Sequence, residues 1–132
     1  MPLESIHKLA FKVAEAANCA GEQGKYWEMH GRLFANQQAF EPWAPHAEAL
    51  GLDVARFETC LSTGKYADEI RRDMAQAATA GVTGTPAFFL AVTDPASSKV
   101  KTLRSLRGAQ PFAAFKAQID GLLAELEAQE KK

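Results

Sequence analysis

The chain is short, close to neutral and of ordinary composition. Its 132 residues fit one domain, and 47% hydrophobic with 23% charged residues exclude a disordered, collagen-like or disulfide-dense chain. A net charge of −1 supplies no field that would attract nucleic acid or an acidic membrane, so we expect neither as a partner.

No targeting or membrane segment is recognisable in the sequence. The longest apolar run, Pro86 to Val92, is far shorter than the roughly 20 residues that a membrane-spanning helix needs. The residues from Met1 to Lys8 lack the basic start and apolar stretch of a secretory signal. As written, the chain is therefore expected to stay in the cytoplasm.

The residues before position 81 predict helices throughout. Apolar side chains recur at three- and four-residue spacing, and polar capping residues, prolines and glycines mark the ends of each periodic stretch. The predicted helices lie between Ser5 and Gly21, Gly24 and Asn36, Pro45 and Gly51, Asp53 and Gly64, and Tyr66 and Gly81.

The period changes after Gly81, and a β-hairpin followed by a helix is predicted. Ala87–Val92 is typical of a buried strand, and the residues from Thr93 to Ser98 of a turn. The second strand, Lys99 to Leu106, carries basic residues and no acids, as an edge strand often does. Pro111 then opens a last helix whose apolar side chains share one face.

Several segments resemble those of DsbA-like thioredoxin-fold proteins. Gly81-Val82-Thr83-Gly84-Thr85-Pro86-Ala87-Phe88-Phe89 is similar to the cis-proline loop of that family and the strand after it. Residues 16–30 and 57–66 resemble the family's helical insertion, and residues 108–112 the entry to its last helix. The similarity covers nearly all of residues 5–126.

The resemblance implies a fold class and a domain organisation. We expect a helix-rich α/β chain with a partial thioredoxin-like fold, in which a helical insertion subdomain is followed by a β-hairpin and a C-terminal helix. The expected organisation is a single DsbA-like domain over residues 1–132, divided into a helical subdomain, 5–80, and the cis-proline loop, strands and final helix, 81–128.

One departure from the family pattern bears on function. Family members begin with a strand and a Cys-x-x-Cys at the start of a helix, whereas this sequence has no Cys-x-x-Cys. Thiol-disulfide exchange needs a thiolate of lowered pKa and a nearby resolving cysteine. We therefore expect a relative of the thiol-disulfide oxidoreductases that is truncated or catalytically inactive, and we assign no catalytic residue. The alternatives are a non-catalytic peptide-binding or scaffold module and a redox sensor that uses Cys19 and Cys60.

The resemblance marks Gly84, Thr85 and Pro86 as a binding loop. A cis bond at Pro86 would let Thr85 offer its main chain to an extended peptide or protein thiol substrate, and Gly84 would leave room for it. From the residues alone, Gly-Thr-Pro is more typical of a simple turn that enters a strand, and it is the resemblance that favours the binding loop.

Cys19 and Cys60 occupy positions where the family often carries a cysteine pair. That resemblance implies a structural disulfide, while a chain without a secretory signal favours two buried free thiols, so both readings stay open. No metal site is predicted, because the cysteines and His7, His30 and His46 lack the short spacing of zinc ligands. No cofactor is expected either.

Four aromatic residues are interpreted as core or inter-helix packing: Trp27, Phe34, Phe40 and Trp43. A partial fold would also leave the strand from Phe88 to Val92 without neighbours, exposing an edge and an apolar face. Self-association into a two-fold homodimer is therefore expected.

Overall fold

The computed structural model describes residues 2–4, 6–37, 39–94 and 96–130. The chain divides into two compact units, Met1–Gly81 and Val82–Lys132, here called the helical unit and the hairpin unit. Each is described by itself. Ser5, which was expected to cap the first helix, lies outside the described residues.

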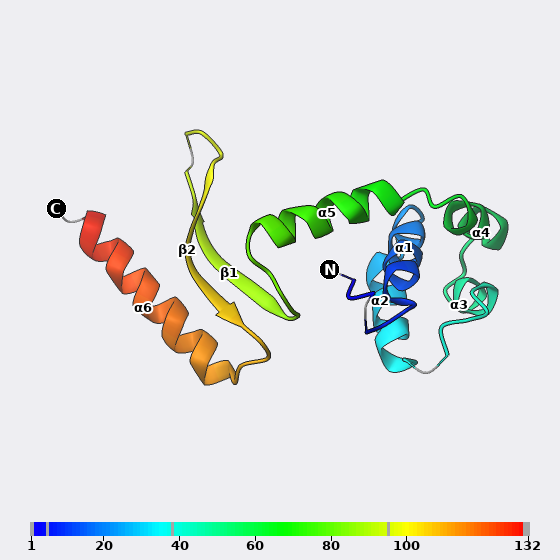
Figure 1. The fold of residues 1–132 in the computed structure, drawn as a ribbon, viewed down its shortest axis with the longest axis horizontal. Coiled ribbons are helices and arrows are strands. Elements are labelled where there is room, and N and C mark those ends of the chain that lie inside the picture. The colour runs from blue at the N-terminus through cyan, green and yellow to red at the C-terminus, as the bar shows by residue number, and fades with distance from the viewer. Residues whose placement is uncertain (1, 5, 38, 95, 131–132) are drawn as a thin grey trace. The chain divides into compact units, whose positions relative to one another are not determined.

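The helical unit contains the predicted run of helices (Figure 1). Asp53 caps α4 as predicted, because its side chain accepts a hydrogen bond from the Arg56 main-chain N–H. At Gly64 the chain has a φ of 65°, a left-handed conformation that glycine adopts readily, and α5 begins just after it. The helices are α1 Ala10–Gly21, α2 Tyr26–Ala35, α3 Ala44–Ala49, α4 Val54–Ser62 and α5 Ala67–Thr79.

The first helix begins later than the sequence pattern predicts. Leu3 accepts main-chain hydrogen bonds from Ile6 and His7, so this segment forms turns before α1 starts at Ala10. Ile6 and Leu9 are exposed. They gain no burial that would favour extending the helix to include them.

The core of the helical unit forms around α1, which packs against α2 and α4. Ala16 and Ala20 are fully buried and small, which lets the larger Met29 and Phe57 fill the space between the helices. Other members of the core are Ala17, Leu33, Ala47, Leu52 and Leu61, with Phe40 and Trp43 packed against them as predicted.

The expectation that Trp27 and Phe34 are core residues is wrong. Their side chains are 73% and 65% exposed. The reason is that α2 turns Met29 and Leu33 into the core, which places Trp27 and Phe34 away from it. His30 lies between them, with ring centroids 5.4 Å from Trp27 and 4.6 Å from Phe34.

The hairpin unit consists of an antiparallel pair of strands and one helix: β1 Ala87–Thr93, β2 Val100–Arg107 and α6 Phe112–Glu130. The predicted hairpin is confirmed. The rings of Phe88 and Phe115 meet edge to face, 4.9 Å between centroids, and Arg104 forms an ion pair with Glu125. These two contacts join α6 to the strands, and Leu106 is buried beside Phe88 in the strand register.

The fold class predicted from the sequence, helix-rich α/β, is confirmed. Within the described ranges, no helix is both long and apolar enough to cross a membrane.

Candidate functional site

The loop Gly84–Pro86 leads directly into β1. Its C-terminal end is held next to the end of β2, because the N–H of Gly108, the residue after β2, donates a hydrogen bond of 2.8 Å to the Pro86 carbonyl. The Thr85–Pro86 peptide bond is cis in the structure. A second cis bond, Glu41–Pro42, was not expected from the sequence.

The loop leaves main-chain groups free for a ligand. Thr85 and Pro86 are exposed, and among the described residues the Thr85 main chain has no hydrogen-bond partner. A Cβ built at Gly84 would meet no atom within 4 Å beyond its chain neighbours, so the space at this position is open. Such a loop can donate and accept hydrogen bonds with an extended peptide.

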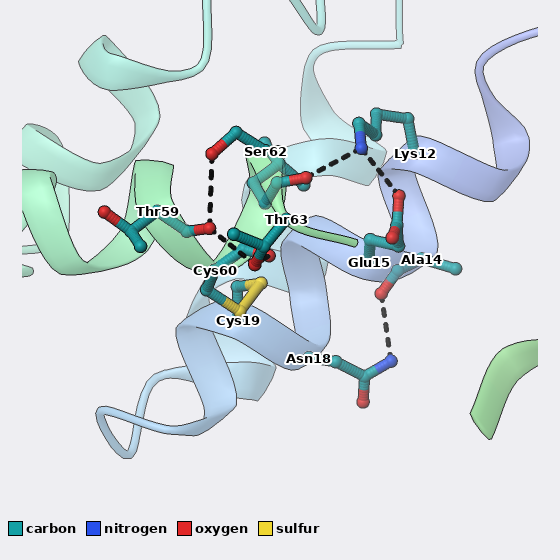
Figure 2. Close-up of polar contacts among 10 residues, drawn as sticks. Lys12, Ala14, Glu15, Asn18, Cys19, Thr59, Cys60, Ser62 and Thr63 are labelled. Atoms are coloured by element: carbon teal, nitrogen blue, oxygen red, sulfur yellow. Dashed lines mark hydrogen bonds and ion pairs between the residues drawn. A yellow bond between two sulfur atoms is a disulfide. The ribbon is translucent and has the colours of Figure 1, made fainter. Parts of the chain in front are cut away.

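The two cysteines form a disulfide between α1 and α4 (Figure 2). The Cα atoms of Cys19 and Cys60 are 5.8 Å apart, a usual separation for a disulfide. The residues are 1% and 6% exposed and belong to the core. Of the two readings left open by the sequence, the structure has the bridged pair.

Polar contacts reinforce the same junction of helices (Figure 2). The Lys12 ammonium donates 2.8 Å hydrogen bonds to the Glu15 carboxylate and to the Leu61 carbonyl in the last turn of α4. A cation at that end of a helix complements its dipole. The buried Glu15 carboxylate is thereby paired, as a buried charge requires.

A third contact joins the end of α1 to α4 and to the segment after it. The Glu22 carboxylate forms ion pairs with Arg56 in α4 and with Lys65 after that helix. The hydrogen bond from Lys65 is the main cause that holds the pKa of Glu22 below its ordinary value. Burial, followed by the hydrogen bond to Glu22, raises the pKa of Tyr66.

His46 has a structural role in the helical unit. Its Nδ1 accepts a 3.0 Å hydrogen bond from Arg32 Nε, and its Nε2 lies 3.1 Å from the Ala39 carbonyl. These contacts fix the connection between α2 and α3. In the part of the chain that the structure describes, no cluster of His, Cys, Asp and Glu could hold a metal ion.

Sequence reasoning missed Glu15 and His46, the buried polar residues of the helical unit. Their partners suggest why. Glu15 depends on Lys12, which also reaches Leu61, 49 residues away, and His46 depends on Arg32 in another helix. The only available signal was a charged or polar residue on an otherwise apolar helix face.

Replacing both cysteines by alanine is expected to destabilise the helical unit. The bridge joins two residues that are 41 positions apart. For a loop of this length the chain-entropy model gives a contribution to the free energy of unfolding of about 4 kcal/mol, which any strain in the native bridge would reduce. Urea unfolding followed by tryptophan fluorescence measures this, because Trp27 and Trp43 both lie in the helical unit. An unchanged midpoint would contradict a stabilising role for the bridge.

The Glu22 ion pairs are expected to make stability depend on pH. Because the folded protein lowers the pKa of this carboxyl below 4.5, the unfolded chain takes up the proton first as the pH falls. The stabilisation is present above pH 4.5 and is lost as the pH falls through the lower, folded pKa. The Glu22→Gln variant should lose this part of the pH dependence in urea titrations, and a dependence equal to that of the wild type would contradict the assignment.

Comparison with known proteins places the chain in a family. The model of the DSBA-like thioredoxin domain matches residues 3–120. No solved structure matches the chain.

Curated relatives carry antiporter names. The chain is 41% identical over 92 residues to Na(+)/H(+) antiporter NhaA 3 of Salinispora tropica, which is 68% of this chain and 14% of that protein. It is 35% identical over 94 residues to Na(+)/H(+) antiporter NhaA 1 of Mycobacterium sp. (strain KMS), 67% of this chain and 15% of that protein. It is 35% identical over 79 residues to Na(+)/H(+) antiporter NhaA of Herminiimonas arsenicoxydans, which is 58% of this chain and 13% of that protein.

The similarity therefore spans only a small part of each relative, 13–15% of its length in these cases. The family model, in contrast, matches most of this chain, including both cysteines and the Gly84–Pro86 loop. The resemblance to DsbA-like proteins seen in the sequence is confirmed, and this protein belongs to the DSBA-like thioredoxin domain family.

Proposed function

We propose that the chain binds an extended peptide or a protein thiol substrate through the Gly84–Pro86 loop, as part of a domain of the thiol-disulfide oxidoreductase type. The observation that carries this proposal is that Thr85 is exposed and that its main chain has no hydrogen-bond partner among the described residues, next to the open position at Gly84. Membership of the DSBA-like family supports it, because proteins of this family act on protein thiols.

The residues of this chain support binding more strongly than redox chemistry. Disulfide exchange needs an accessible thiolate with a resolving cysteine beside it. The sequence has no Cys-x-x-Cys, and its two cysteines are buried and bonded to each other. Burial in the core also favours a structural role for the Cys19–Cys60 bridge over redox sensing.

The bridge also bears on the compartment. Stable disulfides are typical of oxidising compartments and are rare in the cytoplasm. An oxidising compartment such as the periplasm, where DsbA-like proteins are often found, therefore agrees better with the bonded cysteines than the cytoplasm does.

The antiporter names of the relatives give no support for ion transport by this chain, because the similarity covers so little of those proteins. What the chain shares with them is compatible with a peptide-binding domain attached to a larger protein.

A bulky side chain at Gly84 should block peptide binding without disturbing the fold. The probe is the insulin B chain with its cysteines carboxamidomethylated, labelled with fluorescein and followed by anisotropy. Gly84→Leu is expected to weaken binding by about tenfold or more, equivalent to roughly 1.4 kcal/mol. Gly121→Leu is the matched control, because a Cβ at Gly121 also meets no atom within 4 Å. Equal loss in both variants, or none in Gly84→Leu, would overturn the proposal.

The 132-residue chain is expected to reduce insulin with dithiothreitol no faster than dithiothreitol alone. The physical reason is that Cys19 and Cys60 are buried and bonded, so neither is available as an attacking thiolate. The Cys19→Ser/Cys60→Ser variant is the control. Activity above background that disappears in this variant would show that the two cysteines carry redox chemistry.

A further inference from the structure

The two faces of the hairpin carry different charges. On one face Arg104 forms an ion pair with Glu125 of α6, so this face lies against the helix. Because side chains alternate between the two faces of a strand, the odd-numbered residues of β1 and their partners in β2 form the other face. Of the cross-strand pairs on that other face, only Ala87 with Arg107 contains a charged residue.

Arg107 lies at the end of the hairpin that carries the binding loop. Its partner Ala87 directly follows Pro86, and the Pro86 carbonyl accepts a hydrogen bond from Gly108, the residue after Arg107. The side chain of Gln110 donates a 2.9 Å hydrogen bond to the Arg107 carbonyl. These contacts hold the main chain that carries Arg107 beside the loop.

The Arg107 side chain is long enough to reach the loop side of β1. Residues directly opposite each other in such a pair have Cα atoms about 5 Å apart. Only the methyl group of Ala87 lies between, and an arginine stem readily follows an apolar surface while its guanidinium stays in water. The guanidinium of the exposed Arg107 can therefore extend over Ala87 toward a peptide bound at Thr85.

The charge of Arg107 is not balanced by a nearby carboxylate in the described structure. Among the residues placed there, Arg107 forms no ion pair. From Gly81 to Ile119 the sequence contains one acidic residue, Asp94. It lies in the turn at the opposite end of the strands, where it accepts hydrogen bonds from Ala96 and Ser97. The loop end of the hairpin therefore presents an exposed cation.

We infer that Arg107 is a specificity-determining residue, whose guanidinium pairs with an aspartate or glutamate of the peptide bound at the Gly84–Pro86 loop. The inference rests on the proposed function and names its substrate class, extended peptides with an acidic side chain. A guanidinium matches a carboxylate in geometry and forms two parallel hydrogen bonds with it. Because Arg107 is exposed, this pair adds a several-fold preference to the main-chain binding.

The test uses fluorescein-labelled peptides of about nine residues, built from threonine and valine with glutamates at either the odd or the even positions. Side chains of an extended peptide alternate in direction, so one of these two peptides directs its carboxylates to the side of Arg107. The controls carry glutamine in place of glutamate. In anisotropy titrations of the wild type at low salt, one glutamate peptide is expected to bind about threefold to fivefold more tightly than its glutamine control.

Arg107→Gln is expected to abolish the preference for glutamate. Its affinity for the glutamine peptides should equal that of the wild type, which shows that the loop is intact. Lys101→Gln is the matched control, because Lys101 is also exposed in β2 and its replacement changes the net charge equally. Lys101 pairs with the even-numbered Val92, on the face that lies against α6, so this variant should keep the preference.

Three results would overturn the inference and leave peptide binding in place. They are equal affinity of the wild type for glutamate and glutamine peptides, a preference that survives Arg107→Gln, and an equal loss in Lys101→Gln, which would indicate a general effect of charge. Weaker binding of the glutamine peptides to Arg107→Gln would also overturn it, because Arg107 would then support the loop itself. If no peptide binds to the wild type, the proposed function fails and the inference fails with it.

Discussion

The contact between α1 and α4 is the constraint on which the helical unit depends. Ala16 and Ala20 let the helices approach closely, and the Cys19–Cys60 bridge fixes that approach covalently. The chain between the two cysteines includes α2 and α3, so joining its ends confines these helices to the same small core, where they contribute Met29 and Ala47. With native stabilities of about 5–15 kcal/mol, a bridge worth about 4 kcal/mol is a large share of what keeps such a unit folded.

The helices and strands of this fold could be predicted because local sequence signals mark where each one begins and ends. Asp53 caps α4, and the change of period after Gly81 marks the hairpin. The direction in which a helix faces is harder to predict. In α2, both the Met29 and Leu33 face and the Trp27 and Phe34 face are apolar, and only the packing against α1 decides which one is buried.

The candidate site was predictable to a different degree. Gly84, Thr85 and Pro86 were identified through a family resemblance, since Gly-Thr-Pro by itself is also typical of an ordinary turn. The cysteine pairing stayed open because only the family resemblance implied it, and no local signal brings Cys19 near Cys60 across the intervening helices. Nor does the sequence reveal that Glu15 and His46 are buried, because their partners Lys12 and Arg32 stabilise them only after the helices have packed.

Peptide binding and disulfide exchange make separate demands, which is why one can be present without the other. Binding an extended chain needs unpaired main-chain groups and space beside them; among the described residues the Thr85 main chain has no hydrogen-bond partner, and the Cβ position of Gly84 is open. Exchange needs an accessible thiolate, whereas the two cysteines of this chain are buried and bonded to each other between α1 and α4. The same sulfur atoms cannot do both, because a reducible, exposed pair would remove the covalent tie from the core. In this chain the cysteines stabilise the helical unit, and the proposed peptide binding uses the main chain of the Gly84–Pro86 loop instead.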